Sequence, residues 1–455
     1  MRILPLITLI LYSGCSSCSG KNSSGDGNES DTIDVPDENE IVNEDIRNDE
    51  IIPEDAFNET DIALDDSVDS NNDVLDEYSP DCIFLDYPAV DLGSLAPHDF
   101  VSTRDPFPCG ENCRQVSIED YGLYSSDYDV WGNNLAFAAR NVESGSIVES
   151  RIYLIDLTDL GHKYFSRDDI NDRISTDTED KGVIQWISIH ENKMAFSRLS
   201  PHSIIEQNRV EIFIYNIATN NLSLVRTYIY PCISCSARRF DLHGDILVYE
   251  DEKELLAEQV SVLNLSERKE CNISIRDWGS GRPEIYDNNI VFREGKSGYG
   301  VNVYLYDVST DAIRRLTEGS GDHYSPHIWG DNVVWTDTRN GGTELSQENA
   351  DVFMIDITSE IENPVCTHPA SQPQPARIWG NTIVWSDCRN DPTYPNVPSR
   401  AENLDLYMFD ISSSEEAQLT SFPDRETSAK PHENKVYFVM KDETDTKSIF
   451  EITIN

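Results

Sequence analysis

The sequence predicts an all-β fold, a single β-propeller with seven four-stranded blades. Three observations predict it. A short pattern occurs seven times, strands of alternating character accompany each copy, and the chain ends one strand short of a complete seventh unit. Units of about 40–50 residues with four strands each are typical of propeller blades. The propeller is expected to occupy residues 115–455.

The repeated pattern begins with an aromatic residue or histidine and continues with a two-residue turn of Gly, Glu or Asp followed by Asn or Asp. It ends, after three further residues, in an aromatic residue. Gly, Asn and Asp suit tight turns, because they tolerate left-handed backbone or bond to their own turn. Successive copies are 59, 53, 43, 43, 50 and 53 residues apart. They begin at Trp131, His190, His243, Tyr286, Trp329, Trp379 and His432.

The residues ahead of each turn alternate between apolar and polar, which indicates a strand with two distinct faces. Two positions before the leading aromatic residue, every copy has a polar side chain. The first strand of a blade lines the central channel, so these side chains are expected to face it. They are Asp129, Ser188, Asp241, Glu284, His327, Arg377 and Lys430.

Two interpretations of this ring of polar residues remain open. Its acids (Asp129, Asp241 and Glu284) and its basic residues (His327, Arg377 and Lys430) fall in two sectors of the channel. Such a division could orient a charged ligand or the loop of a partner protein. Alternatively, the channel is hydrated and its charges neutralise one another.

Closure of the ring is also predicted. The seventh unit ends at Asn455 after its third strand, whereas Gln115-Val116-Ser117 matches a fourth strand without a unit of its own. This N-terminal strand would complete the last blade and leave no exposed strand edge there. Six blades plus an additional hairpin is the alternative.

The N-terminal region has a different composition. Residues 1–15 contain Arg2, the apolar run Ile3 to Leu11 and small residues before Cys15, which is typical of a signal peptide for export. Residues 16–80 are rich in Asp, Glu, Ser and Asn, and such a segment is expected to be a disordered tether. Residues 81–114 are expected to form an N-terminal extension.

The formal charge of −48 argues against nucleic-acid binding, which requires a basic face.

The end of the signal peptide resembles a bacterial lipobox, although Tyr12 replaces the usual aliphatic residue. The resemblance implies that Cys15 is lipidated and begins the mature chain, whereas the alternative is an ordinary signal peptide. Ser16 follows, where the sorting pattern reserves Asp for the inner membrane. The expected location is therefore the outer membrane, facing the periplasm or the cell surface, with the lipid as the only membrane attachment.

The fifth and sixth units contain an extended form of the repeat, Trp329 to Gly341 and Trp379 to Asn390. These units resemble the TolB-like, or WD40-like, propeller repeat of secreted and surface proteins, and the resemblance covers about residues 115–455. It implies a propeller and usually a binding role, but no particular reaction, because function depends on the site rather than the fold.

The same two units share an Asp-x-Arg-Asn run, at Asp337 and at Asp387. It could form an ion or ligand site. The simpler interpretation is structural: the Asp accepts turn N–H groups, the Arg pairs with the Asp, and Asn is a residue that tolerates left-handed backbone.

Eight cysteines follow Cys15 and Cys18, and an even number in an exported chain suggests disulfides. Cys109 with Cys113 and Cys232 with Cys235 are each close enough in sequence to pair. Cys366 and Cys388 are expected on one face of neighbouring blades, which leaves Cys82 with Cys271 by elimination. A zinc site made of four thiolates is the competing interpretation.

No Gly-x-Ser-x-Gly elbow or phosphate-binding loop occurs in the sequence. We therefore expect a non-enzymatic, monomeric binding or scaffolding protein, without cofactor or metal, whose partner is a protein or glycan of the cell envelope. The alternative is a hydrolase or lyase that uses carboxylates or histidines in the channel.

Overall fold

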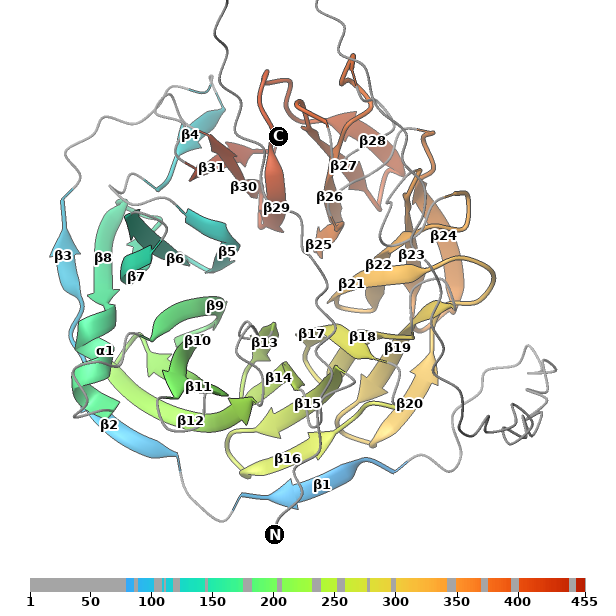
Figure 1. Cartoon of the computed structure of the whole chain (residues 1–455). Helices are drawn as coiled ribbons and strands as arrows, with labels where there is room; N and C mark the ends of the chain where they lie inside the picture. The colour runs from blue at the N-terminus through green and yellow to red at the C-terminus, as the bar shows by residue number, and fades with distance from the viewer. Residues whose placement is uncertain are drawn as a thin grey trace, which may run out of the picture. The chain divides into compact units, whose positions relative to one another are not determined.

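The computed structural model describes residues 79–454 except for the gaps 86–88, 102–108, 110–111, 118–122, 144–145, 175–181, 203–206, 231–238, 252–257, 276–278, 296–299, 342–348, 370–374, 394–400 and 442–446. The described residues confirm the all-β fold and the seven-bladed propeller, with its sheets arranged around a central channel (Figure 1). The signal peptide, Cys15 and the tether lie outside the described residues.

Blades 1 to 3 contain the first three repeat units, and the strands of each unit follow one another from the channel outward. Blade 1 comprises β5 (Leu123–Trp131), β6 (Asn134–Glu143), β7 (Ser146–Asp156) and β8 (Gly161–Ser166), followed by helix α1 (Arg167–Ile174). Blade 2 comprises β9 (Val183–His190), β10 (Lys193–His202), β11 (Gln207–Asn216) and β12 (Asn221–Tyr230). Blade 3 comprises β13 (Phe240–His243), β14 (Ile246–Asp251), β15 (Gln259–Asn264) and β16 (Lys269–Asn272).

Blades 4 to 7 follow the same plan. Blade 4 comprises β17 (Ser280–Tyr286), β18 (Asn289–Gly295), β19 (Val301–Asp307) and β20 (Ala312–Arg315). Blade 5 comprises β21 (His323–Trp329), β22 (Asn332–Asp337), β23 (Asp351–Asp356) and β24 (Ile361–Cys366). Blade 6 comprises β25 (Arg377–Trp379), β26 (Thr382–Asp387), β27 (Asp405–Asp410) and β28 (Glu415–Gln418). Blade 7 comprises β29 (Thr427–His432), β30 (Lys435–Lys441) and β31 (Lys447–Thr453).

The two-residue turns of the repeat join the first and second strands of every blade. In blade 1, Trp131 lies opposite Asn134, which leaves Gly132 and Asn133 as the turn. The first turn residue of all seven copies has a φ between 51° and 59°. Four copies have glycine at this position, and the other three have Glu or Asp. The repeat pattern is therefore a hairpin signature whose first turn residue must adopt left-handed backbone.

The apolar face of each strand packs against the neighbouring blade. A cluster of buried apolar side chains fills each interface, including the one between blade 7 and blade 1, where Tyr437 and Ile449 meet Tyr128 and Phe137. Because every blade contributes to two such clusters, the ring is held together mainly by apolar burial.

The predicted closure is confirmed, two residues earlier than expected. Strand β4 (Cys113–Gln115) pairs antiparallel with β31 and becomes the fourth strand of blade 7. Ile449 O accepts the N–H groups of Val116 and Ser117, which extends the contact beyond the strand. The first and last segments of the propeller thus share one sheet.

The expectation of four strands in every blade is wrong for blades 1 to 3, which have five. Strands β1 (Asp81–Phe84), β2 (Val90–Ser94) and β3 (His98–Phe100) pair with the outer strands β16, β12 and β8. They lie on the rim of the ring (Figure 1), so we call them the belt. The N-terminal extension therefore covers three outer edges, which removes unpaired backbone groups from them.

Two disulfides occur among the described cysteines. Cys82 in β1 is bonded to Cys271 in β16, directly opposite it in the strand register, and Cys109 is bonded to Cys113 beside the closing strand. Cys366 and Cys388 are both buried, and the structure does not join them. Arg389, held by Asp387, donates a hydrogen bond to Cys366 Sγ instead. Cys232 and Cys235 lie outside the described residues.

A candidate binding site in the central channel

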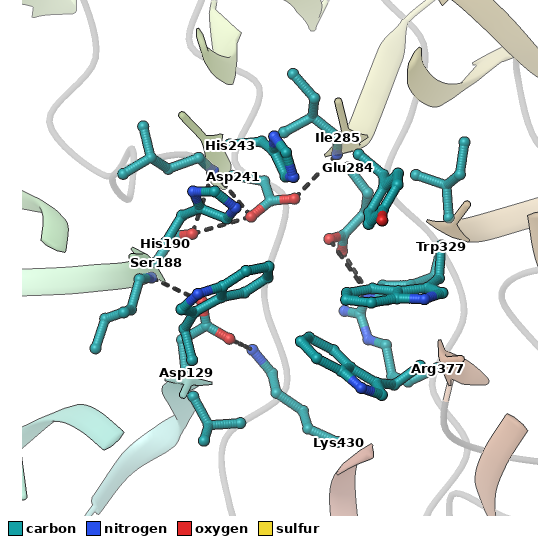
Figure 2. A pocket seen from close by; sticks show the side chains of 18 of the residues that line it. Asp129, Ser188, His190, Asp241, His243, Glu284, Ile285, Trp329, Arg377 and Lys430 are labelled. Carbon is teal, nitrogen blue, oxygen red and sulfur yellow. Dashed lines mark hydrogen bonds and ion pairs between the residues drawn. The ribbon is translucent and has the colours of Figure 1, made fainter. Parts of the chain in front are cut away.

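The innermost strands bring all seven predicted channel residues to one cavity of about 210 Å³. Figure 2 shows this pocket and labels all of them except His327. Because side chains alternate along a strand, every second residue of these strands points into the channel. The result is a stack of layers. The leading aromatic residues of the repeat form an aromatic layer, and the polar residues two positions earlier form a polar layer above it.

The aromatic layer closes one end of the channel. Ring contacts run from blade to blade without a break, with centroid distances between 3.6 and 6.2 Å. Trp131 also reaches across the ring, to within 5.2 Å of Trp379 and 6.1 Å of Trp329. Burial lowers the pKa of His190, to about 4, and also lowers the pKa values of His243 and His432, so this layer is uncharged at neutral pH. The channel is therefore a pocket with an aromatic floor.

The charges of the polar layer pair across the two predicted sectors. Lys430 Nζ lies 2.8 Å from Asp129 Oδ1, and the Arg377 guanidinium contacts the Glu284 carboxylate. Each of these four side chains is between 17% and 26% exposed, so the pairs are accessible from the pocket. The acids and bases thus neutralise one another locally instead of leaving one negative and one positive wall.

Four members of the polar layer also bond their own blade to the next one along the chain. Ile189 donates its backbone N–H to Asp129 Oδ2 at 2.8 Å, and Ile285 donates to Asp241 Oδ2 at 2.9 Å. Leu242 N–H bonds to Ser188 Oγ, and Ile378 N–H to His327 Nδ1. These amides lie on innermost strands, whose channel side has no neighbouring strand. An acceptor at this position of the repeat therefore has a structural role as well as any role in binding.

Asp241 differs from the other acids of the polar layer. The donors it receives are neutral: Ser188 Oγ at 2.9 Å and the backbone N–H groups of Leu242 and Ile285. Burial raises the pKa of Asp241 to about 7, and the negative charges of Glu284 and Asp129 add to this shift. Asp241 therefore changes its charge near neutral pH.

The pKa values of Glu284 and His327 are lowered, whereas that of Asp241 is raised. Burial disfavours the charged form of Glu284, but Arg377, His327 and Lys430 together outweigh it and lower the pKa of this carboxyl group. Burial and the adjacent Arg377 lower the pKa of His327 to about 3, so its ring is neutral. With His327 Nδ1 accepting the Ile378 N–H, the proton of the ring lies on Nε2, which is 3.9 Å from Glu284 Oε2.

Sequence analysis missed two residues at the open end of the pocket. Trp186 and Arg239 line the cavity two positions before Ser188 and Asp241, with the Arg239 guanidinium 5.1 Å from the centre of the Trp186 ring. The signal was available, because the period of two that identified the polar layer also places these residues on the channel face.

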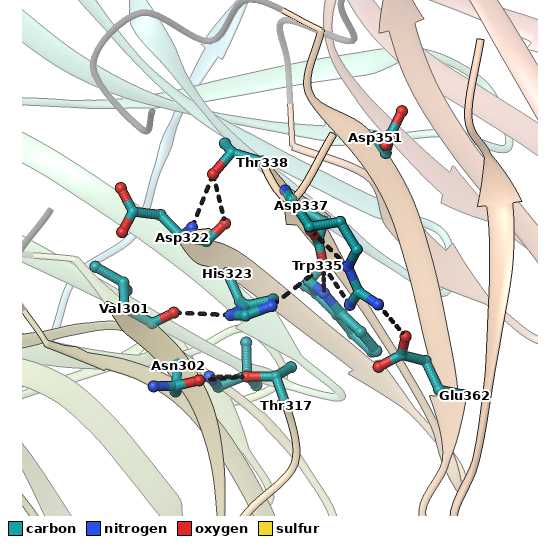
Figure 3. A network of polar contacts seen from close by, with 12 residues as sticks. Val301, Asn302, Thr317, Asp322, His323, Trp335, Asp337, Thr338, Asp351 and Glu362 are labelled. Atoms are coloured by element: carbon teal, nitrogen blue, oxygen red, sulfur yellow. Dashed lines mark hydrogen bonds and ion pairs between the residues drawn. The ribbon is translucent and has the colours of Figure 1, made fainter. Parts of the chain in front are cut away.

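Both Asp-x-Arg-Asn runs form polar networks among residues that do not line the channel pocket, and Figure 3 shows the network around Asp337. Asp337 accepts hydrogen bonds from the Arg339 backbone N–H at 2.8 Å, from the Arg339 guanidinium, and from Trp335 Nε1 at 3.0 Å. Asp387 is bonded in the same way by Arg389 and Trp385. The structure supports the turn interpretation of both runs.

The Asn of each run acts through its side chain and does not make use of left-handed backbone. Neither Asn340 nor Asn390 is among the residues with positive φ. Their amide groups donate to Asp351 Oδ2 at 2.5 Å and to Asp405 Oδ2 at 2.7 Å. Each Asn therefore ties the turn to the first residue of the next strand.

Within the described ranges, no group of three or more His, Cys, Asp or Glu side chains is arranged to hold a metal ion. In the same part of the chain, no helix is long and apolar enough to cross a membrane.

Solved structures resemble this fold at low sequence identity. The β-propeller domain of the Trilobed protease from Pyrococcus furiosus is 11% identical, with a TM-score of 0.52 over 74% of this chain and 94% of that domain. The uncomplexed acylaminoacyl peptidase from Pyrococcus horikoshii is 12% identical, with a TM-score of 0.50 over 74% of this chain and 52% of that one. This chain thus spans about half of the length of that peptidase.

TolB from Acinetobacter baumannii is also among the similar structures, at 13% identity and a TM-score of 0.36 over 70% of this chain and 80% of that chain. No protein-family model matches the sequence, and no curated protein matches it. At these identities the likeness shows a β-propeller and nothing of its activity.

Proposed function

We propose that this protein is an exported, membrane-anchored propeller that binds a protein or glycan of the cell envelope in its channel. The observation that carries the proposal is the pocket itself, which has an aromatic floor, accessible charged pairs in its wall, and Trp186 and Arg239 at its open end. Concave sites with aromatic walls and a few convergent polar groups are typical of ligand binding.

Two features support an extracytoplasmic location. The two disulfides form and persist most readily in oxidising compartments. The sequence ahead of the described residues resembles a lipobox at Cys15, which would supply the anchor. Replacement of this residue, Cys15→Ser, should move the protein from the membrane fraction to the soluble fraction and abolish labelling by a fatty-acid analogue. Unchanged fractionation and labelling would contradict lipidation.

Binding can be tested by crosslinking capture from the cell envelope, together with a glycan panel. The wild-type chain should retain a partner that the double variant Trp186→Ala/Arg239→Ala loses. The matched control is Arg314→Ala, which removes a guanidinium from the outer strand β20, where it contacts Glu360. If the channel variant captures the same partners as wild type, the channel is not the binding surface.

A second candidate function is catalysis by channel carboxylates, as in a hydrolase or lyase. The observation that favours it is the pair Asp241 and Glu284, because burial raises the pKa of one carboxyl group while Arg377 lowers that of the other. Two carboxyl groups whose pKa values are pushed apart are suited to act as general acid and general base.

This candidate predicts an activity that declines above about pH 7, where Asp241 loses its proton. Substrate mixtures of peptides and oligosaccharides should be tested against wild type, Asp241→Asn and Glu284→Gln. Turnover that both variants abolish, while ligand binding survives in at least one of them, would favour catalysis over binding alone. Equal turnover by all three proteins would exclude these two residues as the catalytic pair.

A further inference from the structure

The polar layer has more negative than positive charge when its acids are ionised. It contains three carboxylates, Asp129, Asp241 and Glu284, against Lys430 and Arg377, and His327 is neutral. Lys430 pairs with Asp129 and Arg377 pairs with Glu284. The remaining carboxylate is Asp241, whose hydrogen-bond donors are Ser188, Leu242 and Ile285. A ligand with one positive charge would therefore balance the layer. The other cationic side chain of the cavity, Arg239, does not belong to this layer and lies beside Trp186 at the open end.

The geometry around Asp241 is fixed before any ligand arrives. Ser188 Oγ and Leu242 N bond to Oδ1, and Ile285 N bonds to Oδ2, so both oxygens are held in place by neighbouring blades (Figure 2). A carboxylate oxygen can accept more than one hydrogen bond, which leaves capacity for a further donor. Preorganisation of this kind lowers the entropic cost of binding.

The aromatic floor adds a second attraction for a cation. Trp131, Trp329, Trp379 and Tyr286 line the same cavity as Asp241. The faces of aromatic rings carry negative potential and attract ammonium or guanidinium groups, most strongly for tryptophan. A planar or apolar ligand body can also pack against these rings. The aromatic floor and the Asp241 carboxylate thus both favour a ligand that carries a positive charge.

A metal ion fits these features less well than an organic cation does. The described residues offer no group of three or more metal-binding side chains. Hard metal ions need six to eight oxygen ligands, whereas an ammonium group is satisfied by a few hydrogen-bond acceptors.

We propose that the channel binds the amine or guanidinium group of its ligand, with Asp241 as the carboxylate that pairs with it. This inference rests on the proposed binding function. The group can belong to a basic side chain of a partner protein or to a free small amine, because both sources present the same chemistry to Asp241.

The test is titration calorimetry of the full chain at pH 7.5 with benzylamine and agmatine, and with benzyl alcohol as the uncharged counterpart of benzylamine. We expect heats of binding for the two cations and none for the alcohol. Replacement of Asp241 by Asn should weaken binding about 30-fold or more, because a buried charge would lose its partner. Asp156→Asn, which alters an exposed turn of blade 1, should bind like wild type.

A second measurement does not depend on the folding of a variant. Cation binding favours ionised Asp241, so wild type should release protons on binding near pH 7, and affinity should rise between pH 5 and pH 8. Proton release is measured by repeating the titration in buffers with different ionisation enthalpies. The other charged or titratable groups that line this cavity are Tyr128, Asp129, His190, Arg239, His243, Glu284, Tyr286, His327, Arg377 and Lys430.

The two sources of the cation are separated by a third arm. Short peptides with one internal Lys or Arg, each with blocked ends, are compared with the free amines. Tighter binding of the peptides indicates a basic side chain, and tighter binding of the amines indicates a small ligand. Equal binding of amine and alcohol, or wild-type affinity in Asp241→Asn, would overturn the inference. Capture of an envelope partner in that case would leave the proposed function standing, so the two failures can be distinguished.

Discussion

Blades 1 to 3 and blades 5 and 6 hold their outer strands in different ways. In blades 1 to 3 the belt adds a fifth strand from outside the repeat unit, and Cys82–Cys271 bonds it to blade 3. In blades 5 and 6, Arg339 and Arg389 reach from the turn after the second strand to Glu362 and Glu416 on the outermost strands, at 2.7 and 2.6 Å. The outer strands of blades 1 to 3 are thus held by backbone pairing with an added strand, whereas those of blades 5 and 6 are held by side chains of the same repeat unit.

The difference explains where the repeat is clear in the sequence. The Asp-x-Arg-Asn run occurs in blades 5 and 6 and is absent from blades 2 and 3, which carry belt strands. Blade 2 has an ion pair of its own instead, Arg198 with Glu211, and Arg226 of blade 2 pairs with Glu270 of blade 3. Blades 2 and 3, which lack the Asp-x-Arg-Asn run, are therefore stabilised by other contacts, namely the belt strands and these ion pairs.

The largest effect is expected from removing the central carboxylate of a side-chain network. Asp337→Ala should destabilise the protein by about 3–5 kcal/mol, because Arg339 and Trp335 Nε1 would lose their buried partner. Denaturant unfolding measures the change, and Asp387→Ala should cost a similar amount. A loss below about 1 kcal/mol at both positions would mean that these networks do not hold blades 5 and 6.

Removal of the belt disulfide is expected to have the next largest effect. The bond joins residues 189 positions apart, so Cys82→Ser/Cys271→Ser should lower the free energy of unfolding by about 2–4 kcal/mol. The matched control is Cys109→Ser/Cys113→Ser, which opens a loop of only four residues and should cost less. If Cys109→Ser/Cys113→Ser lowers the free energy of unfolding more than Cys82→Ser/Cys271→Ser does, the bond beside the closing strand matters more for stability than the bond that holds the belt.

The two regions also bury carboxyl groups differently. Burial raises the pKa of Glu426, near blade 6, to about 9, whereas Glu211 in blade 2 pairs with Arg198 at 2.5 Å. Above about pH 4.5 the carboxyl group of Glu426 ionises in the unfolded chain but stays protonated in the folded protein. The folded protein therefore loses stability relative to the unfolded chain as the pH rises from about 4.5 towards 9. Glu426→Gln should therefore gain about 1–2 kcal/mol over wild type between pH 5 and pH 8.

Melting temperatures at pH 5, 6, 7 and 8 provide this measurement. Glu211→Gln is the contrasting variant, and it should destabilise the protein at every pH, because Arg198 would lose the carboxylate that pairs with it. If both variants respond to pH alike, the contrast between the two carboxyl groups is wrong.

The smallest expected effect concerns what the two regions share. Arg389 lies 4.0 Å from the centre of the Tyr407 ring while it pairs with Asp387, and Arg226 lies 4.6 Å from the Tyr228 ring while it pairs with Glu270. Arg389→Lys and Arg226→Lys should each cost about 1 kcal/mol, because lysine cannot stack and form paired hydrogen bonds at once. The measurement is the melting temperature of both variants. If only one of them is less stable than wild type, the stacked and paired arginine does not have the same role in the two regions.

The fold was predictable because its signals are local. Seven hairpin turns with a left-handed first residue leave a fixed pattern, and the alternation ahead of them identifies the channel face. The belt was not predictable, since β1, β2 and β3 are three to five residues long and are specified by pairing with distant strands. Strands this short carry little periodicity, and their register depends on their partners.

The site was predictable as a set of residues and not as an arrangement. The repeat placed Asp241 and Lys430 in one ring, but the pairing of Lys430 with Asp129 depends on blade 7 lying beside blade 1 in the closed ring. The pair of Arg377 with Glu284 depends on side chains that reach past blade 5. These pairs agree with the second interpretation of the ring, in which its charges neutralise one another. The closed floor was missed because the contact of Trp131 with Trp379 joins blades that are not neighbours.

The bond between Cys82 and Cys271 has a mechanical consequence. A force that pulls on the chain ahead of β1 meets this covalent bond at the second residue of the strand, since β1 begins at Asp81. The covalent path of the load then continues into β16 of blade 3, so the chain through β2 and β3 is bypassed. Without this bond, the same pull would act on the pairing of β1 with β16 first and could then peel β2 and β3 from the rim in turn.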